Sequence, residues 1–319
     1  MKPSDHTPAQ ISVFAPGTVS NLGPGFDVLG LALQVPGDVV TVGREGEPGS
    51  MVVSVTGGGG RIPSDPEHNS ASAAARAVLT RLGTDAGLRV DVTKGLPLAA
   101  GLGGSAASAV AGAVATDLLL GGGLTSDDLL RAAVEGEAAG SGAAHADNAA
   151  PALLGGLVLV LPGEPLTWTR IPTPADMYVA IAHPDLEVET RGARDLLPRT
   201  LDVGTAVRQW GNAAGFVAAC YQGDWDLLRR CGVDAFAEGV RKNLVSGFDG
   251  VVASAVQAGA ATSGLSGSGP SVFALCQGEE TAGRVAAAMS AAFDAEGVAS
   301  QTFVSMVATE GARPVSEPL

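Results

Sequence analysis

A glycine-rich segment, Gly95–Ser108, has the residue types of a phosphate-binding loop. It lies between a run typical of a strand, 88–92, and an alanine-rich run typical of a helix that continues to Leu120. The first N–H groups of a helix lack partners within it, and the helix dipole adds positive potential, so such a loop attracts phosphate. Ser105 offers a hydroxyl that could cap the helix or reach a metal ion. Three glycines leave room for a ligand close to the backbone: Gly101, Gly103 and Gly104. The same glycines also suit a tight turn, and the pattern leaves both interpretations open.

Two common nucleotide motifs are absent. None of the lysines, Lys2, Lys94 and Lys242, follows a glycine, so the chain has no P-loop lysine. Ala106 stands where a dinucleotide fingerprint that begins at Gly101 needs its third glycine. If the loop binds phosphate, it follows a different design.

A second cluster lies in 135–151. We expect Glu137 near the end of a helix, and His145, Asp147 and Asn148 in a turn rich in glycine and alanine, where small neighbours leave room for a ligand. The alternative is that Asp147 or Asn148 caps the following helix beside Pro151. His145 alone would more often be a structural hydrogen-bonding residue. A metal site of histidine and carboxylates is not favoured, because the residues lack a recognised ligand spacing.

Two more loops combine glycine with polar residues. The segment 15–30 follows a predicted strand and presents Thr18, Asn21 and Asp27. The segment 264–274 is a glycine and serine loop that leads into a strand, without the G-x-S-x-G pattern of hydrolases.

Composition limits the class of protein. The chain has 319 residues, of which 46% are hydrophobic and 16% are charged, so its composition is not that of a disordered protein. Its net charge of −14 argues against binding to nucleic acid or to anionic lipid. The first ten residues do not resemble a signal peptide, and the apolar run 109–120 is too short for a membrane span, so we expect a buried helix there. The three cysteines predict small buried side chains rather than disulfides. We therefore expect a soluble cytoplasmic protein that binds neither nucleic acid nor membrane.

The elements that must position these clusters form two groups. Strands are predicted at 11–14, 39–42, 51–55, 88–92, 157–161, 178–182, 271–276 and 301–308. Helices are predicted at 70–82, 104–120, 126–139, 200–221, 224–231, 248–257 and 279–293. The segment 162–174 is rich in turn residues and is predicted to connect two domains, 1–165 and 166–319. Because strands and helices do not strictly alternate, the fold class is α+β.

Taken together, and in their order along the chain, the glycine-rich segments described above resemble the motifs of the GHMP small-molecule kinases. The resemblance covers nearly the whole chain. The matching segments are 15–27, 97–107 and 265–271. The segment 141–156 (SGAAHADNAAPALLGG) is similar to the branch that phosphorylates L-homoserine, as is Thr18, where many members have lysine. The resemblance implies a ribosomal-protein-like α/β domain at the N-terminus, a ferredoxin-like α+β domain at the C-terminus, and a homodimer.

The resemblance also implies transfer of the γ-phosphate of ATP to the side-chain hydroxyl of L-homoserine. Asn69 would contact adenine, although it would also serve as a helix N-cap, and Ser105 and Glu137 would hold Mg²⁺. The alternative for Glu137 is an exposed helix charge. The triphosphate would be bound by Pro97, Leu98, Ala99, Ala100, Gly101, Leu102, Gly103, Gly104, Ser105, Ala106 and Ala107.

For the amino acid, the resemblance implies an acid for the ammonium, Asp27, and two arginines for the carboxylate, Arg191 and Arg241. Either arginine alone would more often be a surface cation. Residues near the reacting hydroxyl would be Asn21, His145 and Asn148, with Asn148, Asn21 and Asp147 as the catalytic candidates.

The general base is open at this point. Some family members have aspartate where this chain has Asn148, and a neutral amide does not accept the proton. Because phosphoryl transfer depends mainly on positioning and charge stabilisation, our hypothesis is that the proton passes to the phosphate, directly or through water, with Asp147 as the rival base.

Two residues depart from the family pattern, Gly104 in place of a serine and Gly239 in place of a proline.

The alternative functions are a GHMP kinase for another alcohol, such as a mevalonate-type acid, and a relative that binds ligand without catalysis. The set of Asp27 and two arginines favours a zwitterion over a simple acid. Ser105, Glu137 and those arginines weigh against a relative without catalysis.

Overall fold

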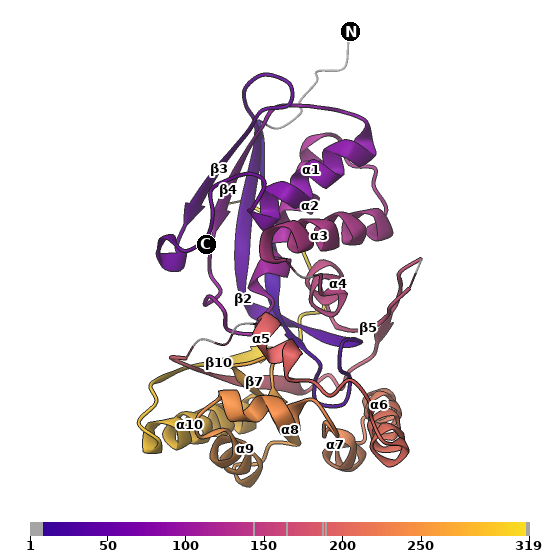
Figure 1. The fold of residues 1–319 in the computed structure, drawn as a ribbon, viewed down its shortest axis with the longest axis vertical. Coiled ribbons are helices and arrows are strands. Elements are labelled where there is room, and N and C mark those ends of the chain that lie inside the picture. The colour runs from indigo at the N-terminus through magenta and orange to yellow at the C-terminus, as the bar shows by residue number, and fades with distance from the viewer. Residues whose placement is uncertain (1–8, 143, 164, 187, 189, 317–319) are drawn as a thin grey trace.

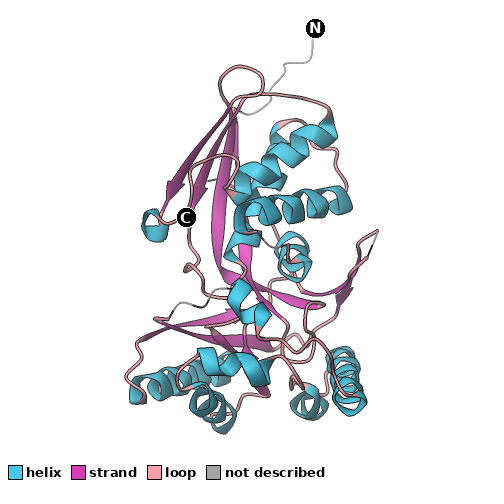
Figure 2. Ribbon diagram, viewed as in Figure 1, coloured by secondary structure: helices cyan, strands magenta, loops and turns pink. Residues whose placement is uncertain are grey.

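The computed structural model describes residues 9–316 except 143, 164, 187 and 189, and it has the predicted α+β fold built on two sheets (Figures 1 and 2). The larger sheet has the order β11-β1-β2-β4-β3, with β5 and β6 extending it from one end of the long strand β2. Its strands are β1 Gln10–Ser20, β2 Leu29–Arg44, β3 Met51–Thr56, β4 Leu88–Thr93, β5 Leu157–Leu161, β6 Thr167–Ile171 and β11 Arg313–Val315.

Four helices cover one face of this sheet (Figure 1). They are α1 Ser70–Leu82, α2 Gly104–Leu119, α3 Ser126–Ser141 and α4 Ala146–Leu154. The predicted burial of the apolar run 109–120 is confirmed, because most of α2 is buried. Small side chains allow α1 to approach closely: a Cβ on Gly112 would lie 2.5 Å from the Ala71 carbonyl oxygen.

Capping residues fix where these helices begin and end. The Asn69 side chain accepts hydrogen bonds from the N–H groups of Ala71 and Ser72, and Gly83 ends α1 in the left-handed region with φ 65°. Thr125 and Asp128 form a reciprocal capping box at the start of α3. The site residues on these helices are therefore held on well-defined elements.

The smaller sheet has the order β10-β7-β9-β8. Its strands are β7 Met177–Pro184, β8 Thr262–Leu265, β9 Val272–Gln277 and β10 Ser300–Met306. Alternate residues face opposite sides. Val179 and Phe273 join the core of the larger sheet, whereas Ala180 and Ala274 join a second core. Helices α9 Phe248–Gln257 and α10 Glu279–Ala295 contribute to that second core.

Helices α6 Val203–Gln222 and α7 Trp225–Cys231 complete the large core. Asp202 caps α6 by accepting a hydrogen bond from the Thr205 N–H at 3.0 Å. Four short elements complete the described fold: η1 Gly58–Gly60, α5 Thr190–Asp195, α8 Glu238–Arg241 and η2 Lys242–Leu244.

The structure differs from the predicted elements in a few places. The predicted turn that holds Asp147 and Asn148 is helix α4, β6 lies within the predicted connection 162–174, and β8 was not predicted. Strands β6 and β11 pair with the larger sheet, so the pairing crosses the predicted boundary at residue 165. That boundary stays a prediction.

Among the described residues, no helix combines the length and the apolar character that spanning a membrane requires.

Candidate active site

A cavity of about 370 Å³ lies where the glycine-rich loops meet. The cavity is lined by the end of β1, the loop before α1, the start of α2 and parts of α3, α4, α5 and α8. Backbone hydrogen bonds hold the loops together: the Thr18 N–H donates to Leu102 O at 3.0 Å, and the Gly267 N–H donates to Ser20 O at 3.2 Å. The segments selected in the sequence therefore form one site.

The loop before α2 needs its glycines. Gly103 caps α2 with φ 65°, and a Cβ there would lie 2.1 Å from Thr18 Oγ1. Pro97–Gly101 and Gly103–Ser105 line the cavity, which is the arrangement expected of a phosphate loop at a helix N-terminus. Leu102, Ala106 and Ala107 are buried in the core and support the loop from behind.

A buried ion pair that the sequence argument missed lies under this loop. Asp38 accepts hydrogen bonds from the N–H groups of Gly95 and Leu96 at 3.1 Å and from Ser108 Oγ at 2.8 Å. Lys94 Nζ pairs with Asp38 and donates to Gly104 O at 2.9 Å. The position of Lys94 beside the loop was the available signal, whereas Asp38 carried none in the sequence. Both side chains are almost fully buried, so the pair fixes the loop.

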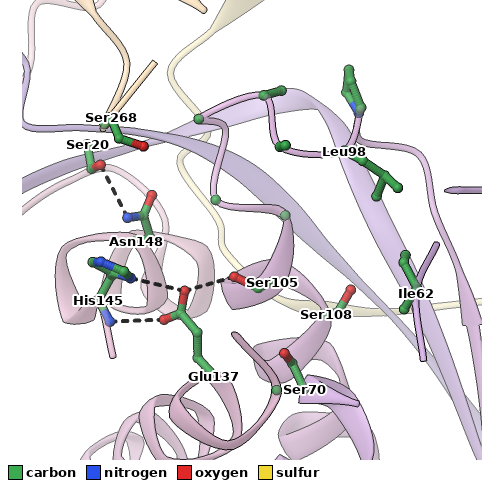
Figure 3. Close-up of a pocket in the computed structure, with 18 of the residues that line it drawn as sticks. Ser20, Ile62, Ser70, Leu98, Ser105, Ser108, Glu137, His145, Asn148 and Ser268 are labelled. Carbon is green, nitrogen blue, oxygen red and sulfur yellow. Dashed lines mark hydrogen bonds and ion pairs between the residues drawn. The ribbon is translucent and has the colours of Figure 1, made fainter. Parts of the chain in front are cut away.

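Ser105 and Glu137 meet at the cavity wall (Figure 3). Ser105 Oγ donates to Glu137 Oε1 at 2.9 Å, and the His145 N–H donates to Glu137 Oε2 at 3.1 Å. Glu137 is 2% exposed, so its interpretation as an exposed helix charge is wrong. Two adjacent hard oxygen donors suit Mg²⁺. The described residues contain no cluster of three histidines, cysteines or carboxylates able to bind a metal alone, so phosphate oxygens and water would have to complete the shell.

Asn148 lies in the first turn of α4 and is held by β1. Its Oδ1 accepts a hydrogen bond from Thr18 Oγ1 at 2.8 Å. Its Nδ2 donates to Ser20 Oγ at 3.2 Å (Figure 3). The interpretation of Asp147 or Asn148 as an N-cap is wrong, because His145 occupies that position. The hydroxyl groups of Thr18 and Ser20, at the end of β1, thus orient the Asn148 amide.

Asp147 is buried beside this amide and lines the cavity. Pro151 lies inside α4 and has no N–H for the Asp147 carbonyl, which faces β2 instead. A Cβ on Gly30 would lie 1.7 Å from that carbonyl oxygen, so only glycine fits there. Burial raises the pKa of Asp147 to about 7. Contact with the Glu137 carboxylate raises the pKa of His145.

Charged groups of both signs gather at the opposite end of the cavity. Arg194 Nη2 lies 2.5 Å from Asp27 Oδ2, and Arg194 Nη1 donates to Asp27 Oδ1 at 3.3 Å. The buried Arg241 donates from Nε to Ala193 O at 3.2 Å, and its guanidinium lies 5.1 Å from the centre of the Phe26 ring. Burial lowers the pKa of Arg241. The reading of Arg241 as a surface cation is therefore wrong.

Arg194, which the sequence argument missed, lines the cavity where Arg191 was expected. The side chain of Arg191 lies outside the described part of the structure, although its backbone is in α5. Arg194 follows it by three residues in the same short helix, about one turn on. The segment therefore carried the signal, but no feature of its residues distinguished Arg194 from Arg191.

Asn21 and Asn69 fix backbone beside the cavity. Asn21 Oδ1 accepts from the Asp27 N–H at 3.0 Å, and its Nδ2 donates to Gly267 O at 2.9 Å. Asn69 caps α1, as the alternative interpretation predicted, and donates to Pro63 O at 2.9 Å. Both residues also line the cavity. Each therefore has a structural role that is compatible with ligand contact.

Comparison with known proteins assigns the class. Residues 69–156 match the GHMP kinases N terminal domain, and residues 216–295 match the GHMP kinases C terminal domain. An L. major mevalonate kinase structure has a TM-score of 0.72 at 17% identity, covering 92% of this chain and 95% of that one, which shows the shared fold alone. The chain belongs to the GHMP kinases, which implies that it uses ATP.

Two relatives narrow the class further. The chain is 39% identical over 317 residues to a homoserine kinase of Chlorobium phaeobacteroides, covering 96% of this chain and 99% of that protein. A crystal structure of homoserine kinase from Cytophaga hutchinsonii has a TM-score of 0.93 at 43% identity, covering 97% of this chain and 98% of that one. Within the GHMP kinases, the chain falls with the homoserine kinases.

Proposed function

We propose that this protein transfers the γ-phosphate of ATP to the side-chain hydroxyl of L-homoserine, giving O-phospho-L-homoserine for threonine biosynthesis. The observation that carries the proposal is the set of opposite charges at one end of the cavity, Asp27 with Arg194 and Arg241, facing a phosphate loop at the other end. That set suits a zwitterion that bears a hydroxyl. We further propose that the protein acts in the cytoplasm as a homodimer.

The nucleotide would bind along Pro97–Ser105, with the N–H groups at the start of α2 directed at the triphosphate. Asn69 would contact the adenine from the neighbouring loop. Ser105 and Glu137 would hold Mg²⁺, which supplies positive charge to the phosphate oxygens when bound. The Asp38–Lys94 pair keeps the loop in place.

The amino acid would bind at the charged end. Its ammonium pairs with Asp27, while its carboxylate takes the guanidinium groups of Arg194 and Arg241. Because Arg194 already contacts Asp27, the two side chains present adjacent charges of opposite sign. Arg191 stays a predicted carboxylate ligand. The substrate hydroxyl then lies toward α4, near His145 and Asn148.

Transfer in this site depends on positioning. Asn148, oriented by Thr18 and Ser20, and Asn21, anchored to Gly267, hold the hydroxyl and its surroundings. The proton of the hydroxyl passes to the transferred phosphate, directly or through water, because a loose transition state needs little help from a base. Asp147 is the rival base, since a pKa of about 7 would let it accept a proton near neutral pH.

A coupled ADP-release assay across L-homoserine, mevalonate and shikimate tests the proposal. We expect turnover of L-homoserine alone. Turnover of another alcohol instead would identify a kinase for a different substrate. Nucleotide binding at saturating Mg²⁺ without transfer to any of the three would identify a relative without catalysis.

A further inference from the structure

The ring of Phe26 lies beside both arginines at the charged end of the cavity. The guanidinium of Arg241 is 5.1 Å from the ring centre, and that of Arg194 is 5.8 Å from it. Both distances are within the range of a cation–π interaction, in which the electron-rich face of an aromatic ring attracts a cation. Arg194 and Arg241 line the cavity, whereas Phe26 does not. Phe26 can therefore act on a ligand only through these two side chains.

Arg241 needs compensation for its buried charge. Burial lowers the pKa of Arg241, and the positive charge of Arg194 acts in the same direction. Arg194 has a carboxylate partner. The hydrogen-bond acceptors that the described residues offer Arg241 are carbonyl oxygens, Ala193 O at 3.2 Å and Gly267 O at 3.4 Å. The ring of Phe26 is thus a further group that stabilises this cation in the protein.

This kind of compensation leaves the charge of Arg241 available to a ligand. A protein carboxylate in the same place would pair with the guanidinium, and the carboxylate of a substrate would have to displace it. Carbonyl dipoles and an aromatic ring stabilise a cation without neutralising it. Arg241 is therefore able to form a charge-assisted hydrogen bond with an anion in the cavity.

Neighbouring groups fix the position of the Phe26 ring. The ring of Phe236 meets it edge-on, with the ring centres 5.1 Å apart and an angle of 69° between the planes. Phe236 comes two residues before α8. Gln209 of α6 joins the two segments: its Nε2 donates to Pro24 O at 2.8 Å, and its Oε1 accepts from the Ala235 N–H at 2.7 Å. The ring is therefore held by the loop after β1 and by the segment before α8 together.

We propose that Phe26 is a positioning residue for substrate recognition, whose ring holds Arg194 and Arg241 at the cavity so that both face the substrate carboxylate. This inference rests on the proposed function, because it takes the carboxylate of L-homoserine as the ligand. It adds a residue that determines specificity without contacting the substrate. Loss of the ring should weaken recognition of the carboxylate and leave recognition of the ammonium group and of ATP unchanged.

Steady-state kinetics with two substrates test this role: L-homoserine, and homoserinol, which lacks the carboxylate. Phe26→Leu keeps an apolar side chain and removes the ring. We expect F26L to raise the KM for L-homoserine by about 10-fold, the factor that a desolvated cation–π interaction supplies. Its kcat, its KM for ATP and its kcat/KM for homoserinol should change by less than about twofold, because the carboxylate contributes to none of them.

A conservative variant and a matched control complete the test. Phe26→Tyr keeps the aromatic face, so its KM for L-homoserine should stay close to that of the wild-type protein. Phe303→Leu on β10 is the control, because Phe303 is also half-buried but does not line the cavity; it should leave the kinetics of both substrates unchanged. Circular dichroism checks that each variant is folded. If F26L does not fold, Phe236→Leu, which removes the ring packed against Phe26, should raise the same KM by a smaller factor without affecting homoserinol.

Three results would overturn the inference. An unchanged KM for L-homoserine in the folded variant would show that the arginines do not need the ring. An equal loss with homoserinol would show that Phe26 only stabilises the loop, as would a loss in F26Y as large as that in F26L. Absence of L-homoserine turnover by the wild-type protein would overturn the proposed function and this inference with it. An active wild-type protein with an unchanged F26L would overturn this inference alone, so the two failures are distinguishable.

Discussion

Asp27 and Arg194 present adjacent charges of opposite sign to the cavity, one for each charge of the proposed amino acid substrate. Arg194 Nη2 lies 2.5 Å from Asp27 Oδ2, so each side chain holds the other in position at the cavity. Arg241, fixed by the Ala193 carbonyl and the Phe26 ring, adds a second cation. The proposed discrimination for a zwitterion therefore rests on a few side chains of α5, α8 and the loop after β1.

The first prediction concerns Arg194→Ala. It should raise the KM for L-homoserine by about 10- to 100-fold, because a charge-assisted hydrogen bond contributes about 1.5–3 kcal/mol. The KM for ATP should not change. Arg284→Ala on α10, which removes an arginine paired only on the surface, is the control. An unchanged KM for L-homoserine in steady-state kinetics would remove Arg194 from the substrate site.

The second prediction concerns Asp147→Asn. If the proton passes to the phosphate, kcat should fall by less than about tenfold, since the amide keeps the shape of the side chain. The kcat should also keep its pH dependence between pH 6 and 8, where the carboxyl with a pKa of about 7 would titrate. A loss of several orders of magnitude in kcat with an unchanged KM would make Asp147 the base.

At the scale of elements, the contact of α4 with β2 positions the end of the cavity where we propose that phosphate is transferred. The Asp147 carbonyl lies against Gly30, and Thr18 and Ser20 of β1 hold Asn148. Close approach of helix and strand backbones is what makes these contacts possible. The site is thus sensitive to small displacements of α4.

The third prediction follows from this contact. Gly30→Ala should lower both the melting temperature and kcat, because its Cβ would lie 1.7 Å from a backbone oxygen that is unable to move alone. Gly250→Ala in α9, where a Cβ meets nothing within 4 Å, is the matched control and should stabilise by about 0.5–1 kcal/mol. Calorimetry and the ADP-release assay check both. Equal melting temperatures for the two variants would contradict the account.

Elements with a clear period were predictable from the sequence. The helix at 70–82 and the strand at 157–161 agree with the structure because their patterns and flanking caps are local. Helix α4 was missed, since glycines precede it and Pro151 interrupts its pattern. Strand β11 has only three residues, and its pairing with β1 joins the two ends of the chain. Such non-local pairing leaves no local signal.

The candidate site likewise has parts that were predictable from local sequence and parts that only the fold brings together. The loops were predictable, because glycine at a positive φ and serine at a helix start have local causes. Asp38, in contrast, belongs to the site through contacts that only the fold creates. The choice of Arg194 beside Arg191 likewise depends on how α5 lies against Asp27.

At the scale of the molecule, acids that folding partly or fully removes from water make stability depend on pH. Burial raises the pKa of Glu238 from 4.5 to about 7 and that of Asp147 from 3.8 to about 7. The folded state therefore holds protons that the unfolded state has released, so stability is greatest below the unfolded pKa and falls as the pH rises to about 7. Repulsion at a net charge of −14 acts in the same direction.

The fourth prediction uses Glu238→Gln, which keeps an oxygen to accept the Leu265 N–H that lies 2.9 Å from Glu238 Oε2. The wild-type free energy of unfolding, measured with urea, should be smaller at pH 8 than at pH 5. The variant should lose about 2 kcal/mol less over that range. An equal loss in both proteins would show that Glu238 does not titrate there.

The central claim is that the cavity selects an amino acid by both of its charges and phosphorylates its hydroxyl. The most direct measurement is kcat/KM for L-homoserine beside two analogues that each lack one charge, 4-hydroxybutyrate without the ammonium and homoserinol without the carboxylate. We predict that kcat/KM for each analogue is lower by about 10- to 100-fold, because each analogue loses a charge-assisted hydrogen bond to Asp27 or to the arginines. Equal values for L-homoserine and 4-hydroxybutyrate would contradict the account.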